Sequence, residues 1–169
     1  QNTERLLLTG GSIPNLRPGT YFIAVENFDR SGPARFSLTV TFPTGTPYTP
    51  NLDVVPIGES RNLLLPASSN SAILLPRQFR IDTQLAWNGL ILEATSNSNV
   101  VMLVRRAQTI QFANGVPVFD SSVLISRGTE RITFDANSTP PYQPTVYYVA
   151  FLSISDTGGT VSFRYTPLP

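Results

Sequence analysis

The sequence predicts an all-β protein with antiparallel strands, and three observations lead to this prediction. The chain of 169 residues holds 15 Pro and 11 Gly, which divide it into short segments separated by turns. Apolar and polar residues alternate in several of these segments, as in a strand with one buried face. No window combines a sustained 3.6-residue period with helix-capping residues. Because the connections are short, antiparallel pairing is favoured.

The predicted strands are rich in aromatic and β-branched residues. The alternation is clearest in residues 35–42, where Phe36, Leu38 and Val40 are separated by polar residues. Pro or Gly interrupts nearly every stretch that could otherwise extend into a helix. In chain order, strands are predicted at residues 20–25, 35–42, 78–83, 89–94, 99–105, 121–125, 130–134, 146–152 and 160–166.

An internal repeat relates the two ends of the chain. Residues 4–42 are a diverged copy of residues 130–166, with the same order of strand, turn and strand. The matching positions keep a constant spacing until a single deletion shortens it by one residue. A repeat of this length indicates consecutive copies of one structural module. The identical pairs are Glu4 and Glu130, Arg5 and Arg131, Pro18 and Pro144, Tyr21 and Tyr147, Ala24 and Ala150, Gly32 and Gly158, Ser37 and Ser162, and Thr41 and Thr166.

The repeat divides the chain into three parts. Residues 1–42 are expected to be the C-terminal strands of a truncated first repeat, which alone would form one sheet with an uncovered apolar face. Residues 43–50 contain three Pro and three Thr, and they predict a fairly stiff, extended linker. Residues 51–169 have the size of one complete β-sandwich module.

Both copies close with the same pattern of strand, polar turn and strand. The first reads Leu-Arg-Pro-Gly-Thr-Tyr-Phe-Ile-Ala-Val at residues 16–25, followed by a Ser-Gly turn and residues 35–42. The second reads Pro-Thr-Val-Tyr-Tyr-Val-Ala-Phe at residues 144–151, followed by residues 160–166. This pattern resembles the bacterial pre-peptidase C-terminal domain. The resemblance implies a jelly-roll-like β-sandwich, carried as an accessory module by secreted bacterial hydrolases and surface proteins. The related collagen-binding domains of clostridial collagenases bind collagen and calcium.

The residue types that are missing exclude several chemistries. The chain contains no Cys, no His and no Lys, so all 12 basic residues are Arg. A serine nucleophile would lack its His or Lys base, and neither Schiff-base nor zinc–thiolate chemistry is available. A net charge of +1 with scattered Arg predicts no nucleic-acid partner, and the apolar runs are too short for membrane insertion. These exclusions favour a protein that is not an enzyme.

One short motif keeps a catalytic alternative open. Asp156-Thr157-Gly158 matches the triplet of aspartic proteases, in which two carboxylates share a proton and activate water. The chain holds a single such triplet, so a dimer would be needed. The corresponding turn of the first copy, residues 29–32, reads Asp-Arg-Ser-Gly, and tight hairpins favour Asp and Gly. A hairpin turn is therefore the expected role, and a dimeric aspartic protease through Asp156 is a remote alternative.

Two places in the sequence offer oxygen ligands to calcium. Asp53 and Glu59, at the entry of the module, lie where the resemblance to the collagenase modules implies a calcium site. Asp135 and Asn137 are a second possibility. Neither place has the dense acid spacing of an EF-hand loop, so ordinary turn roles are the competing interpretation. No other cofactor is expected.

Aromatic side chains in loops are the candidates for binding a ligand. Trp87 lies between two predicted strands, and Tyr48 and Tyr142 lie in Pro-rich loops. Each could stack on a ligand or could instead cover an edge of the core. Tyr147 and Tyr148 point to opposite faces of one predicted strand, so we expect one in the core and the other on the surface.

The function predicted from the sequence is that of a non-catalytic accessory or spacer module. We expect it in a secreted or surface-anchored bacterial multidomain protein, with neighbouring repeats of the same chain as partners. The alternative is a module that binds an extracellular polysaccharide or a matrix protein, with calcium as a possible aid.

Overall fold

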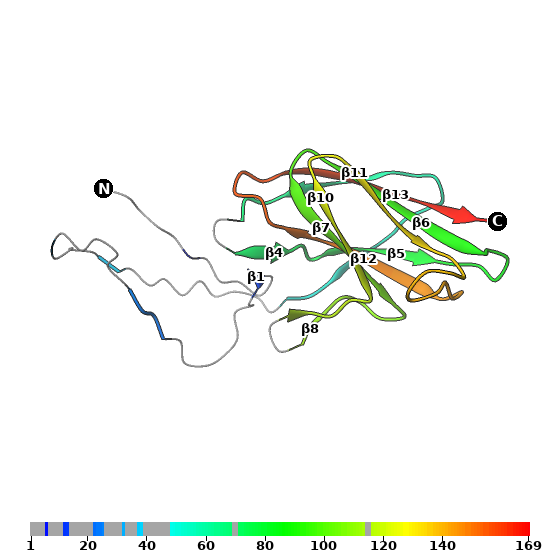
Figure 1. Ribbon diagram of the computed structural model, residues 1–169, viewed down its shortest axis with the longest axis horizontal. Helices are drawn as coiled ribbons and strands as arrows, with labels where there is room; N and C mark the ends of the chain where they lie inside the picture. Colours follow the sequence, from blue (N-terminus) through cyan, green and yellow to red (C-terminus); the bar gives the residue numbers. More distant parts are fainter. Residues whose placement is uncertain are drawn as a thin grey trace.

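In the computed structural model, two β-sheets pack face to face (Figure 1). The structure describes residues 6, 12–13, 22–25, 32, 37–38, 48–68, 71–113 and 116–169. These residues contain strands, turns and bends, and none of them belongs to a helix. Accordingly, no helix that could cross a membrane is found in this part of the chain.

The first sheet, called sheet A, is built around β12. This strand lies between β7 on one side and the consecutive strands β4 and β5 on the other. Two short outer strands extend the same edge: β2 runs parallel to β5, and β1 runs antiparallel to β4. The strands of sheet A are β1 (Ser12–Ile13), β2 (Asn51–Val54), β4 (Ala72–Leu74), β5 (Arg77–Asp82), β7 (Asn99–Arg106), β10 (Ser121–Ser126) and β12 (Val146–Ser153).

The second sheet, called sheet B, has four antiparallel strands in the order β11, β6, β13 and β3. A separate small hairpin of β8 and β9 lies in the connection between β7 and β10. The bounds of these elements are β3 (Arg61–Leu65), β6 (Gly89–Ser96), β8 (Phe112–Ala113), β9 (Val116–Pro117), β11 (Thr129–Phe134) and β13 (Gly159–Leu168).

The path of the chain between the sheets defines a jelly roll. Eight main strands follow one another when β4 and β5 count as one broken strand and the short β1, β2, β8 and β9 are set aside. In this count, the strands of sheet B from β3 to β11 are the first, eighth, third and sixth of the chain. The strands of sheet A, from the broken strand β4–β5 to β10, are the second, seventh, fourth and fifth. Every connection except that from β7 to β10 passes from one sheet to the other. This double-sheet arrangement confirms the predicted antiparallel, jelly-roll-like β-sandwich.

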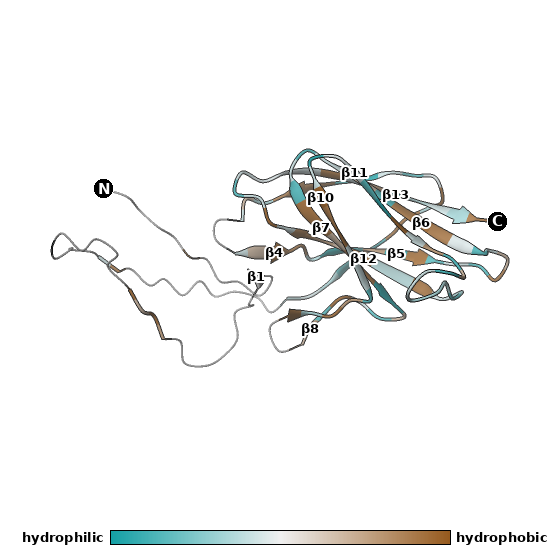
Figure 2. Ribbon diagram, viewed as in Figure 1, coloured by the Kyte–Doolittle hydropathy of each residue, from teal (hydrophilic) through white to brown (hydrophobic). Residues whose placement is uncertain are grey.

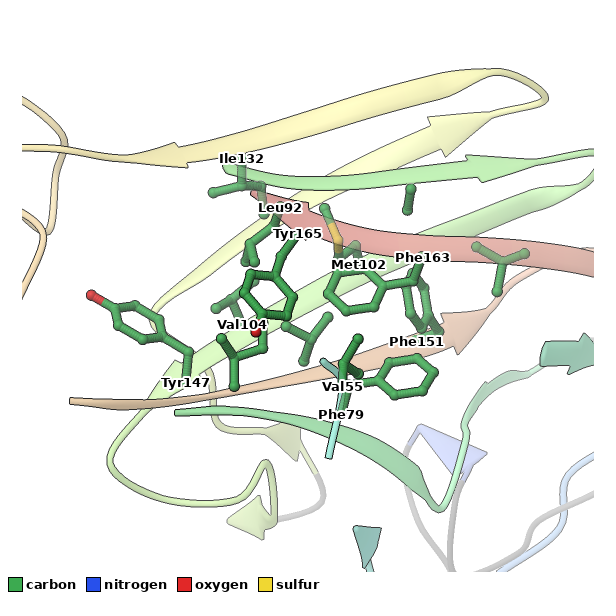
Figure 3. Close-up of a cluster of buried hydrophobic side chains, with 14 of the residues drawn as sticks. Val55, Phe79, Leu92, Met102, Val104, Ile132, Tyr147, Phe151, Phe163 and Tyr165 are labelled. Carbon is green, nitrogen blue, oxygen red and sulfur yellow. The ribbon is translucent and has the colours of Figure 1, made fainter. Parts of the chain in front are cut away.

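The space between the sheets is filled by side chains that alternate inward along each strand. Phe79, Phe151 and Phe163 meet there, as Figure 3 shows, and their rings are almost completely buried. Phe79 stacks on Phe163 with ring centroids 5.0 Å apart, and Phe151 meets Phe163 edge-on at 5.9 Å. Such aromatic contacts add to the free energy gained from burying the ring surface. The sheets therefore enclose a packed core.

Seven of the nine predicted strands correspond to observed ones. They are β5, β6, β7 and β10 to β13, and their ends lie within two residues of the predicted ones. The two remaining predictions fall in the first 42 residues. Phe22 to Val25 and Ser37 to Leu38 are described and are not part of a strand, and the other residues of those two segments lie outside the described residues. That residues 1–42 close a truncated repeat stays a prediction.

The predicted second copy of the repeat, residues 130–166, contributes strands to both sheets. They correspond to β11, β12 and β13, of which β12 lies in sheet A and the other two lie in sheet B. The sequence led us to expect that the equivalent strands of the first copy share one sheet. In the second copy they do not, because a jelly roll places consecutive strands in opposite sheets.

Candidate functional site

One part of the outer face of sheet A is covered by the chain itself. The connection between β7 and β10 carries Ile110, which is buried among Leu74, Leu103, Ala150 and Leu152. These five residues form a second apolar cluster outside the main core, and Tyr48, Ala72, Val101 and Phe112 pack against it. This part of the outer face is therefore interior rather than free surface.

A buried amide fixes this cover in place. The side-chain amide of Gln78 donates to the carbonyl of Ile110 at 2.6 Å and accepts from the Ile110 backbone amide at 2.9 Å. It also donates to the hydroxyl of Tyr48 at 2.8 Å, and that hydroxyl donates to the carbonyl of Leu75 at 3.1 Å. Because Gln78 is completely buried, these bonds replace the water that its amide would otherwise bind. The cover is thus held by polar as well as apolar contacts.

Tyr48, one of the predicted ligand-binding residues, lies inside this arrangement. Its ring meets Phe112 edge-on with centroids 5.2 Å apart. Burial raises the pKa of its hydroxyl, and the hydrogen bond from Gln78 opposes that rise. Both the ring and the hydroxyl of Tyr48 are therefore engaged with the protein. In this position the residue attaches the segment just before β2 to sheet A.

Trp87 and Tyr142, the other two predicted ligand-binding residues, lie together at one end of the sandwich. Trp87 is in the connection between β5 and β6, with its ring centroid 6.4 Å from that of Tyr165. Tyr142 is in the connection between β11 and β12, and it donates a 3.4 Å hydrogen bond to the carbonyl of Gln84 in the loop of Trp87. Both rings are partly buried against the core, while Leu85, two residues before Trp87, is 90% exposed.

Tyr147 and Tyr148 point to opposite faces of β12, as the sequence predicted. Tyr147 is buried, and its hydroxyl donates to the Gln143 carbonyl and accepts from the Gln143 amide, both at 3.1 Å. Burial raises the pKa of the Tyr147 hydroxyl. Tyr148 lies on the outer face of sheet A, where the strand register places it beside Arg80 and Arg105. It is the partly exposed member of the pair.

The structure brings the two predicted calcium ligands to one arginine. Arg61 donates to Glu59 at 2.6 Å and lies 3.7 Å from the carboxylate of Asp53, which also binds Arg77 at 2.6 Å. The positive charge between the two acids is thus a guanidinium group. A calcium ion at this place would have to displace Arg61. Among the residues that the structure describes, no three acidic or other metal-ligating side chains cluster together.

The other acids singled out from the sequence form turns. The Asp135 carboxylate accepts hydrogen bonds from the backbone amides of Asn137 and Ser138, both at 2.8 Å. Asp156 is exposed in the turn between β12 and β13. Because these two strands belong to different sheets, the turn crosses the sandwich and is not the expected hairpin. In the same turn Gly158 has φ of +70° and lies so close to Leu65 that a Cβ would clash. Asp135 and Asp156 therefore both belong to turns.

Sequence reasoning did not find the polar outer face of sheet B. Arg131, Glu93 and Arg164 lie side by side there on β11, β6 and β13. Nε of Arg131 donates to one oxygen of Glu93, and Nε of Arg164 donates to the other at 2.6 Å. The Glu93 side chain is 13% exposed, whereas those of Arg131 and Arg164 are 63% and 54% exposed. The hydrogen bond from Arg131, with further help from Arg164, holds the pKa of Glu93 below its ordinary value.

Uncharged residues, all of them polar except Ile91, flank this charged row on both sides. The next row towards the β6–β7 turn crosses all four strands and consists of Thr129, Thr95, Ser162 and Asn62. The opposite row consists of Thr133, Ile91 and Thr166. A shallow hollow of about 530 Å³ opens at one end of the face, lined by Asn62, Thr95, Ser96, Asn97, Thr160, Val161 and Ser162. Strand alternation alone could place each residue outward, but only the register between strands brings the rows together.

Known proteins resemble this chain in structure and not in sequence. No family model matches the chain, and no curated protein matches it. The pre-peptidase C-terminal domain of a collagenase from Bacillus anthracis is similar over 69% of this chain and 96% of that domain, with 7% identity and a TM-score of 0.48. A CBM4 structure is similar over 64% of this chain and 70% of its own, with 9% identity and a TM-score of 0.32. The first is a domain of the type that the sequence resembles.

Proposed function

We propose that this chain is a non-catalytic accessory module, acting as a spacer in a secreted or surface-anchored bacterial multidomain protein. The observation that carries the proposal is the filled space between the sheets. Phe79, Tyr147, Phe151 and Phe163 occupy it and are almost completely buried. A small-molecule active site needs a concave, largely enclosed pocket, and a core packed in this way offers none between the sheets.

The state of the carboxylates supports the same proposal, because carboxylate chemistry is what the composition leaves available. A carboxylate hydrolase needs two acids that face one another across a cleft, whereas five of the eight described acids are paired with arginines. Of the remaining described acids, Asp135 holds a turn, and Glu130 and Asp156 are exposed. The acids paired with arginines are Asp53, Glu59, Asp82, Glu93 and Asp120.

The proposed setting rests on the sequence. The resemblance to pre-peptidase C-terminal domains implies a secreted or surface protein, and the repeat implies neighbouring modules as partners. The linker of residues 43–50 ends at Tyr48, Thr49 and Pro50, and Tyr48 is bonded to sheet A. A linker that is stiff and anchored at one end suits a spacer better than a free tether.

The proposal is tested by assaying the full chain against peptide, ester and polysaccharide substrates. We expect no turnover above that of buffer. A hydrolytic activity that Asp156→Asn abolishes, while Asp135→Asn retains it, would establish the aspartic-protease alternative and overturn the proposal. Loss of activity in any other single acid-to-amide variant would overturn it as well.

A second candidate function is binding of an extracellular polysaccharide or matrix protein, for which two surfaces are available. One is the uncovered polar face of sheet B, and the other is the end of the sandwich that carries Trp87 and Tyr142. Binding of glycans or collagen that Trp87→Ala and Tyr142→Ala both weaken would locate the site at that end. Unchanged binding in both variants would assign it to a face of a sheet.

Calcium as an aid to binding is tested at Asp53 and Glu59. If calcium displaces Arg61 from these acids, its addition should raise the melting temperature, because a ligand of the folded state stabilises it. The rise should disappear in Asp53→Asn. An unchanged melting temperature at millimolar calcium would remove the metal from the proposal.

A further inference from the structure

We propose that the outer face of sheet B binds an acidic polysaccharide, one that carries carboxylates among its hydroxyl groups. This inference rests on the non-catalytic character given in the proposed function and deepens its second candidate, the binding of an extracellular polysaccharide. The polar face is defined by the charged row of Arg131, Glu93 and Arg164 and the neutral row of Thr129, Thr95, Ser162 and Asn62.

The charged row provides anion-binding groups that are already oriented. Glu93 holds both guanidinium groups by their Nε atoms, and Arg164 adds a second contact through Nη2. The guanidinium group of Arg131 has five N–H donors, of which the Nε donor is directed at Glu93. Because both arginines are more than half exposed, their free donors can reach a carboxylate from solvent. The row carries one positive charge beyond the one that Glu93 neutralises.

The neutral row supplies the groups that hydroxyls bind. The hydroxyls of Thr95 and Thr129 lie 2.7 Å apart, and each keeps further capacity to donate or accept. Ser162 and Asn62 continue the row to the edge of the sheet, where the hollow of about 530 Å³ opens. Adjacent strands lie about 4.8 Å apart, which is close to the length of one sugar unit. A polysaccharide that crosses the strands would therefore meet a polar side chain at each sugar.

The charge and chemistry of the face favour an acidic polysaccharide over other polymers. A nucleic acid needs a stripe of positive charge, and this face offers two arginines around one acid. A neutral glycan is usually bound by stacking on aromatic rings, and the two rows contain none. A uronic-acid polymer presents about one carboxylate with several hydroxyls per unit, which matches a pair of arginines among Thr, Ser and Asn.

The inference is tested by gel retardation of the full chain in polygalacturonate, with dextran as the neutral control. We expect retardation by polygalacturonate that weakens as salt is added, because charge–charge contacts are screened. The double variant Arg131→Gln, Arg164→Gln should lose affinity at least about tenfold, the effect of losing charged hydrogen bonds. Arg80→Gln, a matched change on sheet A, should stay within about twofold.

The variant Glu93→Gln should change the affinity for polygalacturonate in the opposite direction. It removes the only acid of the charged row, so affinity for polygalacturonate should rise severalfold while binding to dextran does not change. Thermal unfolding of each variant shows whether it is folded, and the affinity gain in Glu93→Gln cannot come from unfolding.

Three results would overturn the inference. They are no retardation at low salt, equal retardation by dextran and polygalacturonate, and equal losses in Arg80→Gln and the double variant. Tighter binding to DNA than to polygalacturonate would also overturn it. Failure of the proposed function looks different, because the polysaccharide would then be shortened by the protein.

Discussion

The two outer faces of this sandwich are built in different ways. In both sheets the side chains alternate between the two faces, and the inner faces of both sheets line one core. On sheet A, the outward positions Leu103, Ala150 and Leu152 are apolar and carry a second cluster under Ile110. Figure 2 shows apolar residues continuing into β8, in the connection that lies over this sheet. On sheet B, most outward positions are Thr, Ser, Asn, Arg or Glu, and they lie in contact with solvent.

In this fold, one outer face contributes to the stability of the module, and the other outer face stays exposed to solvent. The outer face of sheet A is bound by the chain itself through Gln78, Tyr48 and Ile110. The outer face of sheet B makes ion pairs within the sheet and is not covered by another described segment. Substitutions on sheet A should therefore change the free energy of unfolding, and substitutions on sheet B should change binding.

The largest expected effect is that of Ile110→Ala. Truncating this buried side chain leaves a cavity in the second cluster, so the free energy of unfolding should fall by about 2–4 kcal/mol. The matched change on sheet B is Ile91→Ala, whose side chain is partly exposed, and its cost should stay below about 1 kcal/mol. Urea denaturation of both variants measures the difference. Equal losses would show that the two faces do not differ in the way described.

The next effect concerns the buried amide. Gln78→Leu removes the partner of the Ile110 backbone amide and carbonyl, and of the Tyr48 hydroxyl. The free energy of unfolding should fall by about 1–3 kcal/mol, since buried polar groups then lack hydrogen bonds. Gln84→Leu, at an exposed position, should cost no more than about 0.5 kcal/mol. A neutral Gln78→Leu would mean that the cover is held by apolar contacts alone.

The smallest effect on stability is expected at Glu93. Its pKa is lowered in the folded state, mainly by the hydrogen bond from Arg131. The resulting stabilisation is present above the ordinary pKa of the carboxyl and is lost as the pH falls through the lowered value. At neutral pH, Glu93→Gln should cost about 0.5–1 kcal/mol, and this difference should shrink in acid. Glu130→Gln is the control, and unfolding curves at several acidic pH values provide the measurement.

Much of the fold could be predicted because its central strands carry clear local signals. In β12, alternation and aromatic residues identify the strand, and they also place Tyr147 inward and Tyr148 outward. β3 was missed because its three consecutive Leu hide the alternation, although Leu64 is 81% exposed and its neighbours Leu63 and Leu65 are buried. The short β2 and β4 depend on pairing with distant strands, which a local pattern does not reveal.

The candidate site was harder to predict because it depends on contacts between distant residues. Tyr48 looked like a free loop aromatic, since its partner Gln78 is 30 residues away. Arg131, Glu93 and Arg164 looked like scattered charges until the register of three strands brought them together. Local sequence therefore predicted which residues face outward, and tertiary packing decided which outward faces remain open.

The most direct test of this division is a map of backbone amide shifts in the full chain during titration with polygalacturonate. We predict that the changes concentrate on sheet B, at Arg131, Glu93, Arg164 and the neighbouring Thr95 and Ser162. The part of sheet A around Leu103, Ala150 and Leu152 should show none, because Ile110 and Tyr48 cover it. Changes that cluster on sheet A, or at the end that carries Trp87, would contradict the account.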